Sequence, residues 1–263
     1  MLDDQSSINH QSATIRCFPD LEALSWTLVD HFANLVHPCD RFCVALSGGH
    51  TPRRFYQLLG TRQDIEWRKV HLFLGDERYV PPSDERSNEK MIKDELVRQI
   101  DIPLANSHWM YDEEGWEYSA KRYDRILHDF FDGRDHTFDL ALQGMGDDGH
   151  TASIFPGSAE FIRLRGPSSA GSEGHGALPE PDESGAPTRV VTTQGPPESP
   201  ERLSCTLDCL AASREVLFVV AGKDKAERLK QVIDGDLRYP AAALASKAKR
   251  VEWWIDEAAA SKL

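Results

Sequence analysis

The stretch FDLALQGMGDDGHTASIFPG, residues 138–157, carries the strongest indication of the fold. It begins with an apolar run at 138–142 that is typical of a buried strand. Glycines and aspartates then end the strand, and His150 follows them. Glycine lets the backbone approach a ligand closely and adopt positive φ, and histidine exchanges a proton near neutral pH. The stretch therefore predicts a catalytic loop at the end of a buried strand.

On either side of this stretch, strand and helix patterns alternate along the chain. Apolar runs predict strands at 42–46, 70–74, 138–142, 216–220 and 251–255. Helical spacing predicts helices at 21–36 after an Asp20 cap, and at 52–59, 87–100, 114–131 and 223–233, with a short alanine-rich helix to 263. This order is typical of a Rossmann-like three-layer α/β fold, in which helices cover both faces of a mostly parallel sheet. Ligands bind at the carboxyl ends of the strands in such sheets.

The length of 263 residues and the 40% hydrophobic content fit one domain spanning residues 1–263. We expect the polar residues 1–12 to be flexible. Residues 166–188 are mostly Gly, Ser, Pro, Ala and Glu, so we expect a mobile surface insertion there.

The first residues contain no apolar signal segment, and no apolar run reaches the ~20 residues that span a bilayer. We therefore expect a cytoplasmic protein that does not contact membranes. The ending Ser261-Lys262-Leu263 matches a peroxisomal address. The alternative is that these three residues simply continue the terminal helix.

The net charge of −13 argues against a nucleic-acid partner, because phosphate backbones require a basic face. A small anionic substrate stays possible, since a local group of Arg, Lys and backbone N–H can hold a phosphate. The five cysteines are an odd number and predict free thiols in a reducing compartment. The pairs Cys39/Cys43 and Cys205/Cys209 lack the usual zinc spacing, so no metal site is predicted.

A first motif, Ser47-Gly48-Gly49-His50-Thr51-Pro52, joins a predicted strand to a predicted helix. Its glycines allow a tight turn with exposed N–H groups, and the helix presents the positive end of its dipole. The motif suits a phosphate, although Ser-Gly-Gly also occurs in plain connections. It has neither the Gly-x-Gly-x-x-Gly spacing of a dinucleotide site nor a P-loop lysine.

A second motif, Gly75-Asp76-Glu77-Arg78, follows the next strand. Arg78 could clamp a phosphate or a developing oxyanion. The alternative is that these charges form ion pairs facing solvent. Ser87 and Asn88, further along, suit the cap of the next helix.

In the opening stretch, His150 is a candidate general base and Asp148 a candidate group to orient its imidazole. The alternative is that Asp148 caps a helix and His150 has no catalytic part. A fourth motif, Gly222-Lys223-Asp224-Lys225, lies at another strand-to-helix junction. Lys225, one turn into the helix, could reach back to a phosphate, or it could be a solvated lysine.

With these four motifs the chain resembles the 6-phosphogluconolactonase family over nearly its whole length. The related glucosamine-6-phosphate deaminases have Ile-Ala-Phe-Asn-Glu-Pro after Asp-Gly-His, whereas Thr151-Ala152-Ser153-Ile154-Phe155-Pro156 stands here, without the glutamate. The resemblance rests on residues 45–49 with 51–52, on 75–78 with 80–81 and 87–88, on 144–146 with 148–153 and 155–157, and on 222 with 225–226. Weaker similarity covers 202–204 with 206 and the end of the chain around Trp254, Asp256 and Ala259.

The resemblance implies hydrolysis of 6-phospho-D-glucono-1,5-lactone in the oxidative pentose phosphate pathway, without metal or redox cofactor. It implies that His150 activates water and Arg78 stabilises negative charge on the carbonyl, while Asp148 and Asp76 orient groups. It also implies that Ser47, Gly48, Gly49, His50, Thr51 and Lys225 hold the phosphate, with Arg202. After Ser-Gly-Gly the family usually has a small residue, whereas this chain has His50. The His50 side chain either adds positive charge near the phosphate or faces solvent.

We expect a monomer or small homo-oligomer. The alternative functions are a glucosamine-6-phosphate deaminase or isomerase on the same fold, and a non-catalytic sugar-phosphate sensor.

Overall fold

The strand and helix alternation expected from the sequence is present in a computed structural model that describes residues 13–165 and 187–263. The predicted flexible segment 1–12 and nearly all of the predicted insertion 166–188 lie outside the described residues. Seven parallel strands form the main sheet in the order β1-β10-β9-β6-β2-β3-β5. They are β1 (Thr14–Phe18), β2 (Phe42–Leu46), β3 (Val70–Leu74), β5 (Ser107–His108), β6 (Leu140–Gln143), β9 (Val216–Val220) and β10 (Val251–Asp256).

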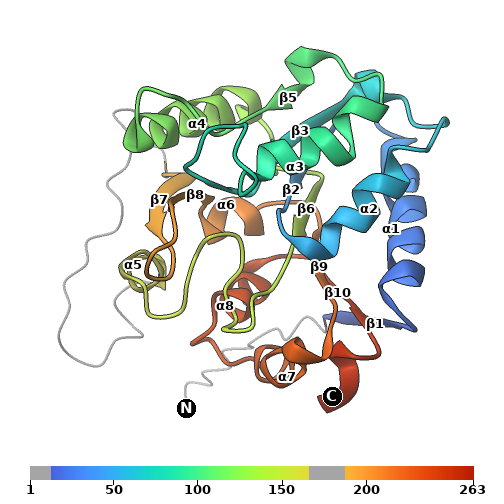
Figure 1. Ribbon diagram of the computed structural model, residues 1–263, viewed down its shortest axis with the longest axis vertical. Helices are drawn as coiled ribbons and strands as arrows, with labels where there is room; N and C mark the ends of the chain where they lie inside the picture. Colours follow the sequence, from blue (N-terminus) through green and yellow to red (C-terminus); the bar gives the residue numbers. More distant parts are fainter. Residues whose placement is uncertain (1–12, 166–186) are drawn as a thin grey trace, which may run out of the picture.

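Helices lie on both sides of this sheet, so the prediction of a three-layer, Rossmann-like α/β fold is confirmed (Figure 1). α1, α2 and α3 lie on one side, and α4, α6 and α8 on the other. The helices are α1 (Leu21–Val36), α2 (His50–Leu59), α3 (Asn88–Glu95), α4 (Trp116–Phe131), α5 (Ala159–Arg165), α6 (Leu207–Ala211), α7 (Ala226–Ile233) and α8 (Pro240–Lys247). Short 3₁₀ turns are η1 (Trp67–Lys69), η2 (Val97–Gln99), η3 (Leu104–Asn106), η5 (Lys223–Lys225) and η6 (Ala259–Lys262).

α1 shows how local sequence forms these helices. The Asp20 side chain accepts a hydrogen bond from the Ala23 amide at 2.8 Å, which caps the first turn as predicted. The helical spacing of Leu24, Leu28 and Phe32 places all three in the core, where none is exposed. The helix bounds 21–36 match the prediction.

Several other predicted bounds are wrong. α2 begins at His50 instead of Pro52, so the proline occupies a later position of the first turn. The helix predicted at 87–100 ends at Glu95, because buried Leu96 has φ −130° and leaves the helical region. The helix predicted at 223–233 is divided into the 3₁₀ turn η5 and the helix α7. Lys225 is therefore the last residue of η5 and precedes α7, whereas the prediction placed it one turn inside a helix.

A second, three-stranded antiparallel sheet, which the sequence patterns did not predict, lies beside the carboxyl ends of the main strands (Figure 1). Its strands are β4 (Asp76–Arg78), β8 (Glu201–Cys205) and β7 (Val190–Gln194). Gly75 joins β3 to β4, and its backbone bonds to Leu46 and Cys205 tie the two sheets together. The register of this sheet places Arg78 opposite Arg202.

The strand order changes direction at β2. From β2 the chain continues to β3 and β5 on one side, and later returns to β6, β9 and β10 on the other. The loops after β2 and β6 therefore diverge and leave a crevice at the carboxyl end, which is the usual ligand site of open α/β sheets. Within the described residues, no helix is both long and apolar enough to cross a membrane.

Candidate functional site

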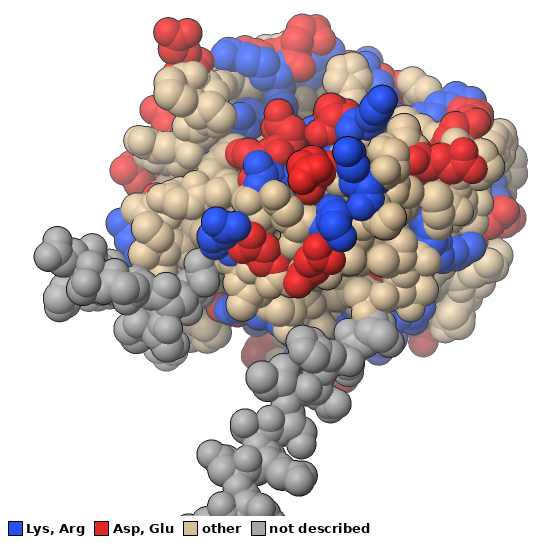
Figure 2. Space-filling view, turned by 90° about the horizontal axis from the view of Figure 1, so that it is seen from below, with Lys and Arg blue, Asp and Glu red and all other residues tan. Residues whose placement is uncertain are grey.

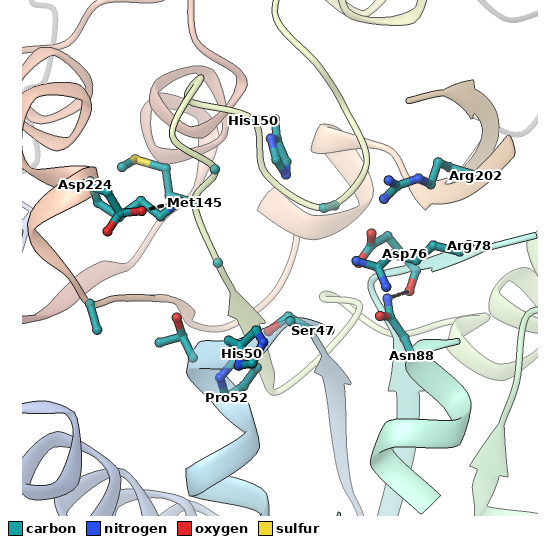
Figure 3. A pocket seen from close by; sticks show the side chains of 18 residues that line it. Ser47, His50, Pro52, Asp76, Arg78, Asn88, Met145, His150, Arg202 and Asp224 are labelled. Atoms are coloured by element: carbon teal, nitrogen blue, oxygen red, sulfur yellow. Dashed lines mark hydrogen bonds and ion pairs between the residues drawn. The ribbon is translucent and has the colours of Figure 1, made fainter. Parts of the chain in front are cut away.

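A pocket of about 440 Å³ opens at this crevice, at the carboxyl ends of β2, β3, β6 and β9. Figure 3 shows His150, Arg202, Asp76, Asn88 and Ser47 surrounding it, although they come from separate segments. Every residue predicted for the site lines this pocket except Asp148, which lies behind His150. The lining residues are Ser47, Gly48, Gly49, His50, Thr51, Pro52, Asp76, Arg78, Asn88, Gly144, Met145, Gly146, His150, Ala152, Arg202, Ala221, Asp224 and Lys225.

The loop after β6 holds His150 through Asp148. The Oδ1 atom of Asp148 lies 2.6 Å from Nδ1 of His150 and also accepts the His150 amide at 3.0 Å. Burial acts to raise the pKa of Asp148, but the hydrogen bond and charge of His150 outweigh it, so the pKa is lowered. An ionised carboxylate only accepts hydrogen bonds, so Nδ1 of His150 is the donor of this pair. In the neutral form of the ring, this arrangement leaves the lone pair of Nε2 free.

Gly146 is required for this arrangement. A Cβ atom at this position would lie 2.1 Å from Nδ1 of His150 and 2.7 Å from Oδ1 of Asp148. The amide of Gly146 donates to the His150 carbonyl at 2.9 Å, which closes the turn. The His150 ring also contacts Phe155, with ring centroids 4.6 Å apart. The alternative of Asp148 as a helix cap is wrong, because residues 147–149 form a turn without a helix.

Two arginines form the wall that the small sheet contributes. Arg78 and Arg202 lie opposite each other on β4 and β8. The Nε atom of each is buried and has no hydrogen-bond partner among the described residues. Burial lowers the pKa of Arg202, and the positive charge of Arg78 lowers it further. Two close cations with unused donors are suited to an anionic group.

Asp76 connects this wall to the His150 loop. Asp76 is only 7% exposed, and its Oδ2 accepts a hydrogen bond from Oγ of Ser153 at 2.5 Å. Ser153 in turn accepts from Thr193 on β7 and donates its amide to Ser204 on β8. The alternative of solvent-facing ion pairs is therefore wrong for Asp76, and also for Glu77, which is not exposed at all.

The turn at Ser47–Thr51, between β2 and α2, lies at the base of the pocket (Figure 3). Gly49 has φ +98° and precedes α2, whose first turn has no side-chain cap. The uncapped N–H groups and the helix dipole give this turn affinity for an anion. His50 and Thr51 begin the helix beside it, and the carbonyl of Ser47 accepts from the buried hydroxyl of Tyr56 at 2.7 Å.

Lys225 reaches the same pocket from the loop after β9. The φ of +101° at Gly222 turns the chain into η5, and the carboxylate of Asp256 accepts the Gly222 amide at 3.0 Å and 3.1 Å. Lys225 forms an ion pair with Asp224 at 3.3 Å. The structure therefore brings this lysine and the α2 N-terminus to one cavity.

Asn88 is the main pocket residue that sequence reasoning missed. Ser87, not Asn88, caps α3, since its hydroxyl accepts the Lys90 amide at 3.1 Å. The Asn88 side chain instead turns back to the pocket, where Nδ2 donates to the Asp76 carbonyl at 2.9 Å. The sequence predicts a helix cap for this Ser-Asn pair and includes it in the family resemblance, but no local pattern indicates the contact of Asn88 with the pocket. Among the described residues, no group of three His, Cys, Asp or Glu side chains could hold a metal ion.

Fold and site together define a Rossmann-like α/β protein whose pocket combines a histidine paired with an aspartate and two groups of basic side chains. The chain belongs to the family of glucosamine-6-phosphate isomerases and 6-phosphogluconolactonases, which residues 19–253 match. It is 32% identical over 261 residues to the 6-phosphogluconolactonase of Nostoc sp., covering 95% of this chain and 98% of that one.

Solved structures give the same result. The 6-phosphogluconolactonase of Thermotoga maritima superimposes with a TM-score of 0.71 at 28% identity, covering 93% of this chain and all of the other. A monomeric glucosamine-6-phosphate deaminase superimposes with a TM-score of 0.74 at 19% identity, covering 95% of this chain and all of the other. At that identity the likeness concerns the fold alone.

Proposed function

We propose that this protein hydrolyses 6-phospho-D-glucono-1,5-lactone to 6-phospho-D-gluconate, in the oxidative pentose phosphate pathway. The observation that carries the proposal is the Asp148–His150 pair, which leaves Nε2 free beside two arginines with unused donors. Relatives over most of the chain are 6-phosphogluconolactonases, which supports this reaction over others on the fold.

In the proposed mechanism, Nε2 of His150 accepts a proton from water as the water oxygen attacks the lactone carbonyl. Asp148 keeps Nδ1 protonated and stabilises the imidazolium that forms. Negative charge grows on the carbonyl oxygen, and Arg78 stabilises it. The tetrahedral intermediate then breaks its bond to the ring oxygen, which takes the proton back from His150.

The phosphate lies, in this proposal, at the Ser47–Thr51 turn, with Lys225 and the N-terminus of α2 as its partners. His50 and Arg202 add positive charge to the same cavity, and we assign both to substrate binding. Asp76 holds the Ser153 loop and so orients the wall that carries Arg78.

We further propose that the enzyme works in the cytoplasm without a nucleic-acid partner. The net charge of −13 supports the absence of a nucleic-acid partner, and the five free cysteines support a reducing compartment. On the face in Figure 2, the basic side chains of the described residues are interspersed with acidic ones.

The test is to add the protein to freshly prepared 6-phosphogluconolactone and to follow acid release against the spontaneous rate. We expect acceleration, and little with unphosphorylated gluconolactone, which lacks the group for the Ser47–Thr51 turn. Ammonia release from glucosamine 6-phosphate would instead support a deaminase. Binding of 6-phosphogluconate without any turnover would support a sensor, and either result would overturn the proposal.

A further inference from the structure

Glu77 is a buried carboxylate that binds two residues of the pocket wall, Arg78 and Asn88, through their backbone amides. It is not exposed, and its two oxygens accept four hydrogen bonds. Oε1 accepts the amides of Arg78 and Asn88, both at 2.7 Å. Oε2 accepts the amide of Glu89 at 2.7 Å and the hydroxyl of Ser87 at 3.1 Å.

This carboxylate occupies the position at the N-terminus of α3 that an anion would take. The amides of Asn88 and Glu89 are the first two of the helix, and their partial positive charge favours a negative group. Glu77 comes from the neighbouring strand β4, so its side chain locks β4 to α3. Such a lock fixes the spacing between the two elements that carry Arg78 and Asn88.

Two of the groups held by Glu77 line the pocket. Asn88 donates from Nδ2 to the Asp76 carbonyl, and its side chain packs directly on Gly48. A Cβ at Gly48 would lie only 1.9 Å from Oδ1 of Asn88. Arg78 donates from Nη1 to the Arg86 carbonyl at 2.6 Å, in the segment between β4 and α3. Movement of Glu77 would therefore displace Arg78, Asn88 and the Gly48 turn together.

We propose that Glu77 is a positioning residue for the proposed lactone hydrolysis, and that its ionised form holds Arg78, Asn88 and the Gly48 turn in their working arrangement. This inference rests on the proposed function for its catalytic consequence. Its structural part, the dependence of ligand binding on the Glu77 charge, is independent of turnover.

Protonation of Glu77 is expected to loosen this arrangement. A neutral carboxyl must donate one proton, so it cannot keep four donors. Burial raises the pKa of Glu77 to about 7, against the lowering effect of the backbone amides. The charged groups near it are Asp76 and Arg78 on its own strand, Arg202 on β8 and Glu89 on α3. The ionised form therefore dominates above about pH 7 and is lost as the pH falls.

The test compares Glu77→Gln with Glu89→Gln. Glu89 is also buried, at 4% exposed against 0% for Glu77, and lies at the same helix end, but its side chain pairs with Lys93 and does not line the pocket. We expect Glu77→Gln to lower kcat/KM about 10- to 100-fold, since hydrogen bonds to a charged group are lost. Glu89→Gln should stay within about 3-fold of the unmodified enzyme, and thermal melting should show both variants folded.

The second measurement is the affinity for 6-phosphogluconate, determined by calorimetry between pH 5.5 and 8.5. If Glu77 had only a structural role, the dependence of this affinity on pH would be the same with and without its carboxylate. The measurement uses a His50→Asn/His150→Gln background, so that neither pocket histidine contributes to the profile, and the contribution of the ligand phosphate is common to both proteins. We expect affinity to fall below about pH 7 when Glu77 is present, and to be low at every pH in Glu77→Gln. If Glu77→Gln does not fold, Glu77→Asp takes its place in the same comparison, because it keeps the charge but shortens the reach to the amides of Asn88 and Glu89.

Equal kinetics for the two glutamine variants, or an unchanged affinity profile, would overturn the inference. Absence of lactonase activity in the unmodified protein would instead overturn the proposed function, and the calorimetric profile would still test Glu77.

Discussion

At the scale of single residues, the site depends on a histidine whose two ring nitrogens have different surroundings. Nδ1 faces the Asp148 carboxylate at 2.6 Å, and the imidazole lines the pocket. The absence of a side chain at Gly146 makes room for this pair. Each of these three residues lies in the stretch 138–157, so local sequence already places them within one turn.

We predict that His150→Gln lowers kcat for the lactone about 10²- to 10⁴-fold, because a positioned general base is lost. KM should change little, since glutamine keeps a polar side chain of similar reach. Stopped-flow measurement of acid release, corrected for spontaneous hydrolysis, checks this. Retention of full activity would remove His150 from the mechanism.

Lys225 tests the phosphate assignment. We predict that Lys225→Ala raises KM about 10-fold, because a charge-assisted hydrogen bond to phosphate is lost, and leaves kcat nearly unchanged. The matched control is Lys223→Ala on the same turn, which is exposed and does not line the pocket. Steady-state kinetics of both variants provide the measurement, and equal KM values would contradict the assignment.

At the scale of elements, the turn before α2 and the first residue of α3 depend on each other. Asn88 is 2% exposed, and its side chain lies where a methyl group on Gly48 would be. We predict that Gly48→Ala lowers kcat/KM about 5- to 100-fold, since overpacking a buried contact typically has this cost.

The double variant Gly48→Ala/Asn88→Ala separates contact from backbone effects. If the two side chains conflict directly, the double variant should lose less than the sum of the single losses. Strict additivity of the logarithms of kcat/KM would show that the two positions act independently.

The bounds of helices and strands are predicted correctly where a local contact sets them, and are missed where packing in the core sets them. Asp20 caps α1 where predicted, because its hydrogen bond to Ala23 lies within one turn. The helix after Ser87 is shorter than predicted because Leu96 enters the core with a non-helical φ of −130°. The sequence patterns missed the short strands β4 and β8, because charged residues occupy both: Asp76 and Glu77 on β4, and Glu201 and Arg202 on β8.

At the scale of the whole molecule, a histidine at the sheet edge influences stability at acidic pH. His108 on β5 stacks on Phe73, with ring centroids 4.2 Å apart, and does not line the pocket. Burial and then the charge of His71 lower the pKa of His108 from 6.5 to about 4. Between these values the unfolded chain binds a proton that the folded protein does not, so the stability contribution falls as pH drops from 6.5 to 4.

We predict that His108→Phe reduces the loss of Tm between pH 7 and pH 4.5, because the substituted ring keeps the stacking and cannot be protonated. Activity at pH 7.5 should stay unchanged. Differential scanning calorimetry across this pH range checks the prediction, and parallel Tm profiles for the two proteins would contradict it.

The sequence by itself determined the alternation of strands and helices, the parallel sheet and the loops that carry His150, Ser47 and Lys225. These features depend on periodicity and turn residues, which act between near neighbours in the chain. Only the tertiary structure decided that Arg78 lies opposite Arg202, that Asn88 packs on Gly48, and that Glu77 is buried. Those contacts depend on strand register and on helix packing across long chain separations, and no local pattern specifies them.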